Sequence, residues 1–132
     1  RPNQIQPREG FFTIPREGRI EDFVTRMIDT RLSGAESYRL HVRPEGITIS
    51  AGTPRGLFYA MQSVRQLIAT SVGRIPCMCI CDEPATLSCF MIDCARHFFT
   101  VADLKKMIDA AALFKMNVFH WHLTDDQAGA LR

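Results

Sequence analysis

A chain of 132 residues with 16 basic and 14 acidic side chains, and so a formal net charge of +2, suits one domain, or one small domain plus a fragment. The arginines are scattered along the sequence, which argues against nucleic acid or an anionic membrane as a partner. No apolar run approaches the roughly 20 residues needed to cross a bilayer. The chain begins Arg1-Pro2 rather than with Met, which indicates a processed or trimmed amino terminus.

Strand and helix patterns alternate in the first half of the chain. Residues Gly10 to Ile14 predict a short strand, and apolar residues at helix spacing then predict an amphipathic helix from Ile20 to about Leu32. Apolar and polar residues alternate in 38–42 and again in 47–51, with the turn-forming sequence Arg-Pro-Glu-Gly between them. This pattern predicts a β-hairpin with one face toward a core.

A second helix is expected to begin at Thr53 and Pro54, because threonine caps helices and proline fits the first helical position. Its buried stripe is predicted to be Leu57, Met61, Val64 and Ile68. Residues 74–81 predict another strand. The sequence Asp82-Glu83-Pro84 then marks a break that suits a domain boundary.

The last third of the chain predicts one β-α-β unit. Residues 89–94 are an apolar run interrupted only by Asp93, which is typical of a strand covered on both faces, and residues 118–123 predict a second strand. In parallel α/β folds, sites form at the carboxyl ends of the strands. Charged and aromatic residues follow both strands, so the pattern predicts part of an active site there.

The helix between these two strands is predicted over residues 101–116. Thr100 and Asp103 resemble a capping box at its start, and Asn117 suits its carboxyl cap. The inner face of the helix is predicted to be Leu104, Met107, Ile108, Ala111 and Phe114.

Five cysteines are present, and an odd number does not suit a closed disulfide framework. Cys77, Cys79 and Cys81 alternate along a predicted strand, so they share one face and are poorly placed to bridge one another. The favoured interpretation is that they are small, buried core residues. A metal site is the alternative.

Arg96 and the aromatic residues after it are candidates for ligand binding. The planar fork of Arg96 suits vicinal hydroxyls or a carboxylate, and the alternative is a surface arginine paired with a neighbouring acid. His97, Phe98 and Phe99 could line a wall against which a sugar ring packs. The favoured interpretation is that they pack between strand and helix.

His120 and His122 flank a tryptophan on the second strand, so both imidazoles face the same side. With Asp125 or Asp126 they could form a metal site, although packing inside the sheet is favoured. Adjacent aspartates at a strand end point in different directions. One supporting carboxylate that orients another group is therefore expected, rather than a directly acting pair.

Six sequence stretches together resemble the β-N-acetylhexosaminidases of glycoside hydrolase family 20. They are Glu-Ser-Tyr-Arg-Leu (36–40), Gly-Ile-Thr-Ile-Ser-Ala (46–51), Gly-Leu-Phe-Tyr-Ala-Met-Gln-Ser-Val-Arg-Gln-Leu (56–67), Asp-Glu-Pro (82–84), Met-Ile-Asp-Cys-Ala-Arg-His-Phe-Phe (91–99) and Lys-Met-Asn-Val-Phe-His-Trp-His-Leu-Thr-Asp-Asp-Gln (115–127). The resemblance runs in order over most of the chain from about residue 10.

The resemblance implies two domains. Residues 1–82 are similar to an accessory α+β domain, in which an antiparallel-rich sheet carries helices on one face. Residues 83–132 are similar to the first β-α-β portion of a (β/α)₈ TIM barrel, truncated after its second strand. A complete barrel needs about 250 residues, so an exposed apolar patch and an open sheet edge are expected, with self-association through the incomplete barrel as a consequence.

The resemblance also implies a chemistry: release of terminal N-acetylglucosamine or N-acetylgalactosamine with retention, in which the substrate's own acetamido oxygen is the nucleophile. No cofactor or metal is implied. Arg96 matches an arginine that grips hydroxyls of the terminal sugar, and Asp125 matches an aspartate that acts through a histidine on the general acid. The general-acid Glu and its Asp partner have no counterpart, because Asp82-Glu83 precedes the first barrel strand.

The chain by itself is therefore expected to lack hydrolase activity. The alternative is a non-catalytic, oligomerising interaction module derived from the same fold. Family members are often secreted, periplasmic or lysosomal, and the sequence does not choose among these compartments.

The last five residues depart from the family pattern. Family members commonly continue with Gly-Trp-Arg-Ile-Glu, where this chain has Ala128-Gly-Ala-Leu-Arg132. Deleting one base from codons for the former yields the latter, so we hypothesise a frameshift, with a deliberately cut chain as the alternative. The DNA sequence beyond Gln127 decides between them.

Overall fold

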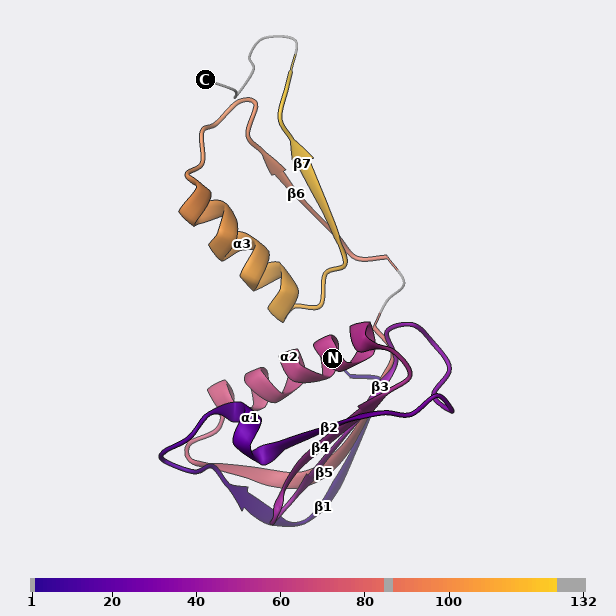
Figure 1. Ribbon diagram of the computed structural model, residues 1–132. Coiled ribbons are helices and arrows are strands. Elements are labelled where there is room, and N and C mark those ends of the chain that lie inside the picture. The colour runs from indigo at the N-terminus through magenta and orange to yellow at the C-terminus, as the bar shows by residue number, and fades with distance from the viewer. Residues whose placement is uncertain (1, 85–86, 126–132) are drawn as a thin grey trace. The chain divides into compact units, whose positions relative to one another are not determined.

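The computed structural model describes residues 2–84 and 87–125, and the chain divides into two compact units, Arg1–Pro84 and Ala85–Arg132. The first unit contains a five-stranded sheet in the order β1-β5-β3-β4-β2. Its strands are β1 (Gln4–Thr13), β2 (Val24–Ile28), β3 (Tyr38–Arg43), β4 (Gly46–Ala51) and β5 (Arg74–Asp82). Helix α2 (Pro54–Thr70) lies along one face of this sheet (Figure 1).

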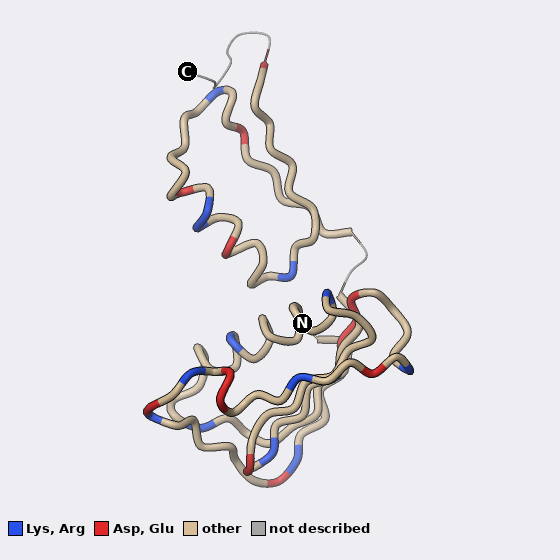
Figure 2. The backbone as a smooth tube through the Cα atoms, in the orientation of Figure 1, with Lys and Arg blue, Asp and Glu red and all other residues tan. Residues whose placement is uncertain are grey.

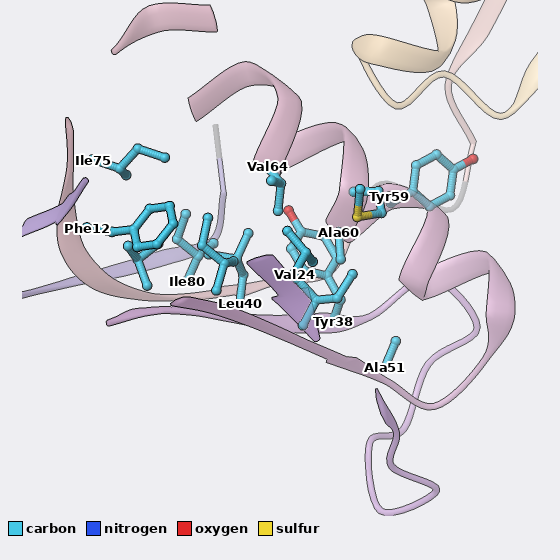
Figure 3. Close-up of a cluster of buried hydrophobic side chains, with 14 residues drawn as sticks. Phe12, Val24, Tyr38, Leu40, Ala51, Tyr59, Ala60, Val64, Ile75 and Ile80 are labelled. Atoms are coloured by element: carbon cyan, nitrogen blue, oxygen red, sulfur yellow. The ribbon is translucent and has the colours of Figure 1, made fainter. Parts of the chain in front are cut away.

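The core of the first unit lies between the sheet and α2. Figure 3 shows side chains from the strands and from the helix pointing toward one another. Leu40 of β3, Ile49 of β4 and Val64 of α2 are each fully buried, and removing such side chains from water is the main force that holds the sheet and helix together. The predicted hairpin is confirmed as β3 and β4, and the predicted strand over 74–81 is confirmed as β5.

Helix α2 begins as predicted. The Thr53 hydroxyl accepts a hydrogen bond from the backbone N–H of Gly56 at 3.1 Å, and Pro54 occupies the first helical position. Of the predicted stripe, Met61 and Val64 are buried. Its two end members, Leu57 and Ile68, are half-buried and pack against the edge of the core.

The predicted helix over residues 20–32 is wrong. Only a single turn, α1 (Ile20–Phe23), is helical, and the chain then continues as β2. Residues of β2 pair in parallel with β4, in the register Val24 to Ile47 and Ile28 to Ala51. Pairing with the otherwise open edge of β4 satisfies backbone groups, and β-branched residues favour the extended conformation, so sheet formation outweighs the helical spacing of the apolar residues.

Strand β1 is longer than the predicted strand over Gly10 to Ile14. It pairs antiparallel with β5 from Gln4 onward, and its register shifts between Pro7 and Phe11. Gly10 lies in this irregular stretch with a φ of +97°, a conformation that favours glycine. The bulge returns Phe12 to the core, where its side chain is 4% exposed.

A buried phenol joins three elements of the first unit. The Tyr38 hydroxyl of β3 donates to Asp82 Oδ2 of β5 at 2.8 Å and lies 2.6 Å from Ser63 Oγ of α2. Asp82 Oδ1 accepts from the backbone N–H of Asn3 at 3.1 Å. Burial raises the pKa of Tyr38 well above its ordinary value, so the phenol stays neutral and serves as a donor.

Replacing Tyr38 by Phe is expected to lower the free energy of unfolding by about 1–3 kcal/mol, because Asp82 and Ser63 lose a buried partner. Urea unfolding followed by circular dichroism measures the loss. The matched control is Tyr59→Phe, since the hydroxyl of Tyr59 makes no hydrogen bond to the described residues. Equal losses in the two variants would show that the network contributes nothing specific.

The second unit is one β-α-β arrangement, as predicted. Strands β6 (Cys89–Asp93) and β7 (Val118–His122) pair in parallel, with Phe90 opposite Phe119 and Ile92 opposite Trp121. Helix α3 (Val101–Leu113) connects them. The Thr100 hydroxyl accepts from the backbone N–H of Asp103 at 3.1 Å, which confirms the predicted cap.

The end of α3 differs from the prediction. The helix stops at Leu113 rather than at residue 116, and Phe114, not Asn117, is its carboxyl cap. Lys115 takes a φ of 61°, which turns the chain away from the helix axis. Asn117 Oδ1 instead accepts a hydrogen bond from the Ser88 backbone N–H at 2.9 Å, and the Asn117 backbone N–H donates to the Ser88 carbonyl at 3.0 Å. These two hydrogen bonds join the start of β7 to the start of β6.

The second unit leaves much of its apolar surface exposed. Strand β6 was predicted to be covered on both faces, but Met91 is 57% exposed, and no residue of α3 is buried. Phe114, predicted on the inner face of the helix, is 70% exposed. Two strands and one helix have too few neighbours to cover both faces of a sheet. In the described residues, no helix is long and apolar enough to span a membrane.

Candidate functional site

The candidate site lies where β6 and β7 end. Because the two strands are parallel, their carboxyl ends meet at the same edge of the sheet. Arg96, just beyond β6, and Asp125, just beyond β7, are joined there by an ion pair of 2.8 Å between Nε and Oδ2. The two residues that the sequence singled out therefore lie side by side, as the predicted parallel arrangement required.

A third residue, Asp93, fixes this corner and was not among the predicted site residues. Its Oδ1 accepts hydrogen bonds from the backbone N–H groups of Ala95 at 3.0 Å and Arg96 at 3.1 Å. Its Oδ2 lies 3.1 Å from Arg96 Nε. One carboxylate thus shapes the loop after β6 and orients the guanidinium. The only signal in the sequence was a single charged residue at the end of an apolar strand.

The guanidinium of Arg96 is held through Nε, and its terminal nitrogens are left to bind a ligand. Both carboxylates contact Arg96 through Nε, and its terminal nitrogens make no hydrogen bond to the described residues. The Arg96 side chain is 70% exposed, whereas those of Asp93 and Asp125 are 29% and 27% exposed. Exposed ion pairs add little stability. What this arrangement offers is a planar pair of donors held in a fixed direction, suited to neighbouring hydroxyls.

The aromatic residues after Arg96 remain accessible, because His97 and Phe98 are exposed and Phe99 is half-buried. Phe99 and Phe98 line a cleft of about 290 Å³ together with Leu104 and Ile108 of α3 and Trp121 of β7. Phe99 also lines a second hollow with Arg96 and His97, so the packing favoured from the sequence stays a prediction. In the same unit, the indole N–H of Trp121 donates to Cys94 Sγ at 3.2 Å.

The histidine and cysteine alternatives assemble no metal site in the described residues. His120 and His122 face the same side, with ring centroids 6.2 Å apart, and no group of three or more potential ligands gathers within residues 2–84 and 87–125. His122 Nε2 is buried and has no hydrogen-bond partner among these residues. Asp126 and the tail to which the frameshift hypothesis refers lie outside the described residues.

Cys77 and Cys79 are buried, as favoured, whereas Cys81 is only half-buried, and none of the three lies in the core between sheet and helix. They lie on the opposite face of β5, where Cys79 Sγ is 3.8 Å from His41 Nε2. Burial raises the pKa of the Cys79 thiol, which keeps it protonated at neutral pH.

Two family models match this chain. The model described as "Glycosyl hydrolase family 20, domain 2" matches residues 15–83, and the model described as "Glycosyl hydrolase family 20, catalytic domain" matches residues 88–131. The chain belongs to glycosyl hydrolase family 20. It carries the accessory domain and an incomplete segment of the catalytic barrel, which is the predicted fold class.

Similar proteins support this assignment. The β-hexosaminidase of Porphyromonas gingivalis is 42% identical over 112 residues, which cover 76% of this chain and 14% of that protein. The β-N-acetylhexosaminidase of Cellulomonas fimi is 40% identical over 107 residues, covering 77% of this chain and 21% of that protein. This chain therefore spans only 14% to 21% of the length of these relatives.

Solved structures give the same result. A β-N-acetylhexosaminidase from Bacteroides fragilis has a TM-score of 0.80 at 30% identity, covering 94% of this chain and 32% of that one. An exo β-N-acetylglucosaminidase from Vibrio harveyi, solved in complex with N-acetylglucosamine, has a TM-score of 0.83 at 29% identity and covers 96% of this chain and 25% of that one.

Proposed function

We propose that this chain supplies the accessory domain and one corner of the active site of a β-N-acetylhexosaminidase. The observation that carries the proposal is the cluster of Arg96, Asp93 and Asp125 at the shared carboxyl edge of β6 and β7. In this role the terminal nitrogens of Arg96 donate to hydroxyls of a terminal N-acetylhexosamine. The complex of the Vibrio harveyi enzyme with N-acetylglucosamine supports this ligand class.

Asp93 and Asp125 have different parts in the proposed site. Asp93 orients Arg96 from within β6. Asp125 is held by Arg96 at 2.8 Å and is proposed to act through a histidine on the general acid of the complete site. The reaction is proposed to proceed with retention through the acetamido group of the substrate. This corner of the site binds and positions the sugar, and it contains no counterpart of the proton donor. The 132-residue chain alone is therefore proposed to be inactive.

A chimaera tests the proposal. Residues 15–125 of this chain replace the matching segment of the Cellulomonas fimi β-N-acetylhexosaminidase, to which the chain is 40% identical over 107 residues. The chimaera is expected to hydrolyse a chromogenic N-acetylglucosaminide, while the 132-residue chain shows no turnover. A folded but inactive chimaera would contradict the proposed site. Turnover by the chain alone, abolished by Arg96→Ala, would contradict its proposed inactivity.

The exposed apolar residues of the second unit support a second candidate, a self-associating module without catalysis. Phe114, Met91 and Trp121 are 70%, 57% and 48% exposed, and both edges of the β6–β7 pair are open among the described residues. Light scattering measures the oligomeric state of the 132-residue chain. The second candidate function requires a defined oligomer of this chain and, in the activity assay, an inactive chimaera.

A further inference from the structure

The face of the first unit's sheet that lies opposite α2 gathers basic side chains. In β3, the core residues Tyr38, Leu40 and Val42 alternate with Arg39, His41 and Arg43, which point to this opposite side. We call it the outer face. Its outward positions on the neighbouring strands are Gly46, Thr48 and Ser50 of β4, and Cys79 and Cys81 of β5, which pair with the β3 residues in register. Gln4 and Gln6 of β1 continue the same rows.

Several arginines of the first unit, Arg65 and Arg74 among them, form no ion pair among the described residues, and the arginines of the outer face belong to this group. Arg26 and Arg31 form ion pairs with Glu21 and Asp29, at 3.6 and 2.8 Å. Among the described residues, neither Arg39 and Arg43 of β3 nor Arg8 of β1 forms such a pair (Figure 2 colours the charged positions). All three are exposed.

His41 lies among the three arginines of the outer face. The pKa of His41 is lowered by its partial burial and then by Arg43, Arg8 and Arg39, so all three guanidinium groups act on one imidazole. Like charges gathered on one sheet face destabilise it unless an anion compensates them. Cys79, which pairs with His41 across the strands, also feels Arg8 and Arg39.

The acidic residues near this face lie at its margins, and one of them, the exposed Glu83 just after β5, lines a shallow hollow together with Arg39 and Cys81. Glu9 follows Arg8 in the irregular part of β1, and Glu45 lies in the turn between β3 and β4. Asp29 is within electrostatic reach of Arg39, but its carboxylate already binds Arg31 through two hydrogen bonds. The outward positions of β3, β4 and β5 carry no acid, so an incoming anion meets guanidinium groups first.

We propose that the outer face, through Arg8, Arg39 and Arg43, binds an anionic glycan. Guanidinium forks bind sulfate and carboxylate oxygens, and Arg39 and Arg43, four residues apart on one strand, are separated by roughly 13 Å, which suits successive groups of an extended chain. The hydroxyls of Thr48 and Ser50 on the next strand suit the neutral hydroxyls of a sugar.

The choice of a glycan over another polyanion rests on the proposed function. A glycan held by the accessory domain is bound by the same polypeptide that supplies part of a hexosaminidase site. Double-stranded DNA and anionic vesicles carry comparable charge, and they serve as the competing outcomes of the test.

The test uses the 132-residue chain and chondroitin sulfate, whose repeats contain a hexosamine, a sulfate and a carboxylate. We expect saturable binding by calorimetry that weakens as salt is added. The variant Arg8→Gln/Arg39→Gln/Arg43→Gln is expected to bind at least about tenfold more weakly. The control Arg65→Gln/Lys105→Gln/Lys106→Gln removes the same number of positive charges from α2 and α3 and is expected to bind like the parent chain.

Two further readouts locate the ligand and guard against misfolding. Binding of the polyanion is expected to raise the pKa of His41, because the negative charge of the ligand offsets the field of the three arginines. Nuclear magnetic resonance titration of the His41 ring measures this pKa. The variant Arg8→Lys/Arg39→Lys/Arg43→Lys keeps the charge but loses the forks, so intermediate affinity is expected. Circular dichroism checks that each variant keeps the fold.

Three results would each overturn the proposal: no binding of chondroitin sulfate by the parent chain, equal weakening in the outer-face and control variants, or tighter binding of DNA or anionic vesicles than of the glycan. None of these depends on catalysis. The chimaera assay tests the proposed function separately, so failure of one does not imply failure of the other.

Discussion

Replacing Gly56 by Ala is expected to destabilise the first unit by about 1–3 kcal/mol, although Ala is the better helix former. Gly56 lies in the first turn of α2, where the helix crosses the ends of β3 and β4. A Cβ at this position would lie 2.6 Å from the carbonyl oxygen of Ser37 and 2.7 Å from the Cβ of Ala51. Neither neighbour is the flexible end of a side chain, so the helix itself must move away from the sheet.

Urea unfolding followed by far-ultraviolet circular dichroism measures this loss. The control is Arg65→Ala, an exposed position of the same helix, which is expected to change the free energy of unfolding by no more than about 0.5 kcal/mol. A Gly56→Ala variant as stable as the parent chain would show that α2 shifts without cost, and that close approach of helix and sheet does not limit the packing.

The elements that the sequence predicted correctly are those whose signals are local. The β3–β4 hairpin has strict alternation on both sides of a turn, and α2 has a threonine cap followed by proline. Residues 20–32 carry an equally clear helical spacing, yet β2 forms there, because the deciding factor is the unpaired edge of β4. That edge exists only once the hairpin has folded, so a local window of sequence does not contain it.

The candidate site also has one part that the sequence predicted and one part that it did not. Arg96 and Asp125 were predicted to lie together because each follows a strand of one β-α-β unit, and parallel strands end at one edge. The part played by Asp93 depends on the path of the loop after β6, which its residue type does not reveal. The outer face shows a related limit, since arginines that look scattered in the sequence are brought to one surface by strand alternation.

The Arg96→Ala variant of the chimaera is expected to have a kcat/KM about 10²–10³-fold lower than the parent chimaera, because in the proposed site the donors of Arg96 fix the terminal sugar relative to the reacting bond. Arg96→Lys is expected to recover only part of this loss. Lysine keeps the charge near Asp125 but lacks the planar fork and the Nε that both carboxylates hold. Steady-state kinetics with the chromogenic N-acetylglucosaminide measure both variants.

Asp93→Asn separates positioning by Asp93 from direct contact with substrate. Asparagine still accepts the backbone hydrogen bonds of Ala95 and Arg96 through its Oδ1, but it loses the ionic contact of 3.1 Å with Arg96 Nε. A smaller loss than that of Arg96→Ala is therefore expected, and adding Asp93→Asn to Arg96→Ala should cost little more, because the carboxylate acts through the guanidinium. Fully additive losses would mean that Asp93 contributes independently of Arg96. Arg96→Ala kinetics equal to those of the unsubstituted chimaera would remove Arg96 from the site.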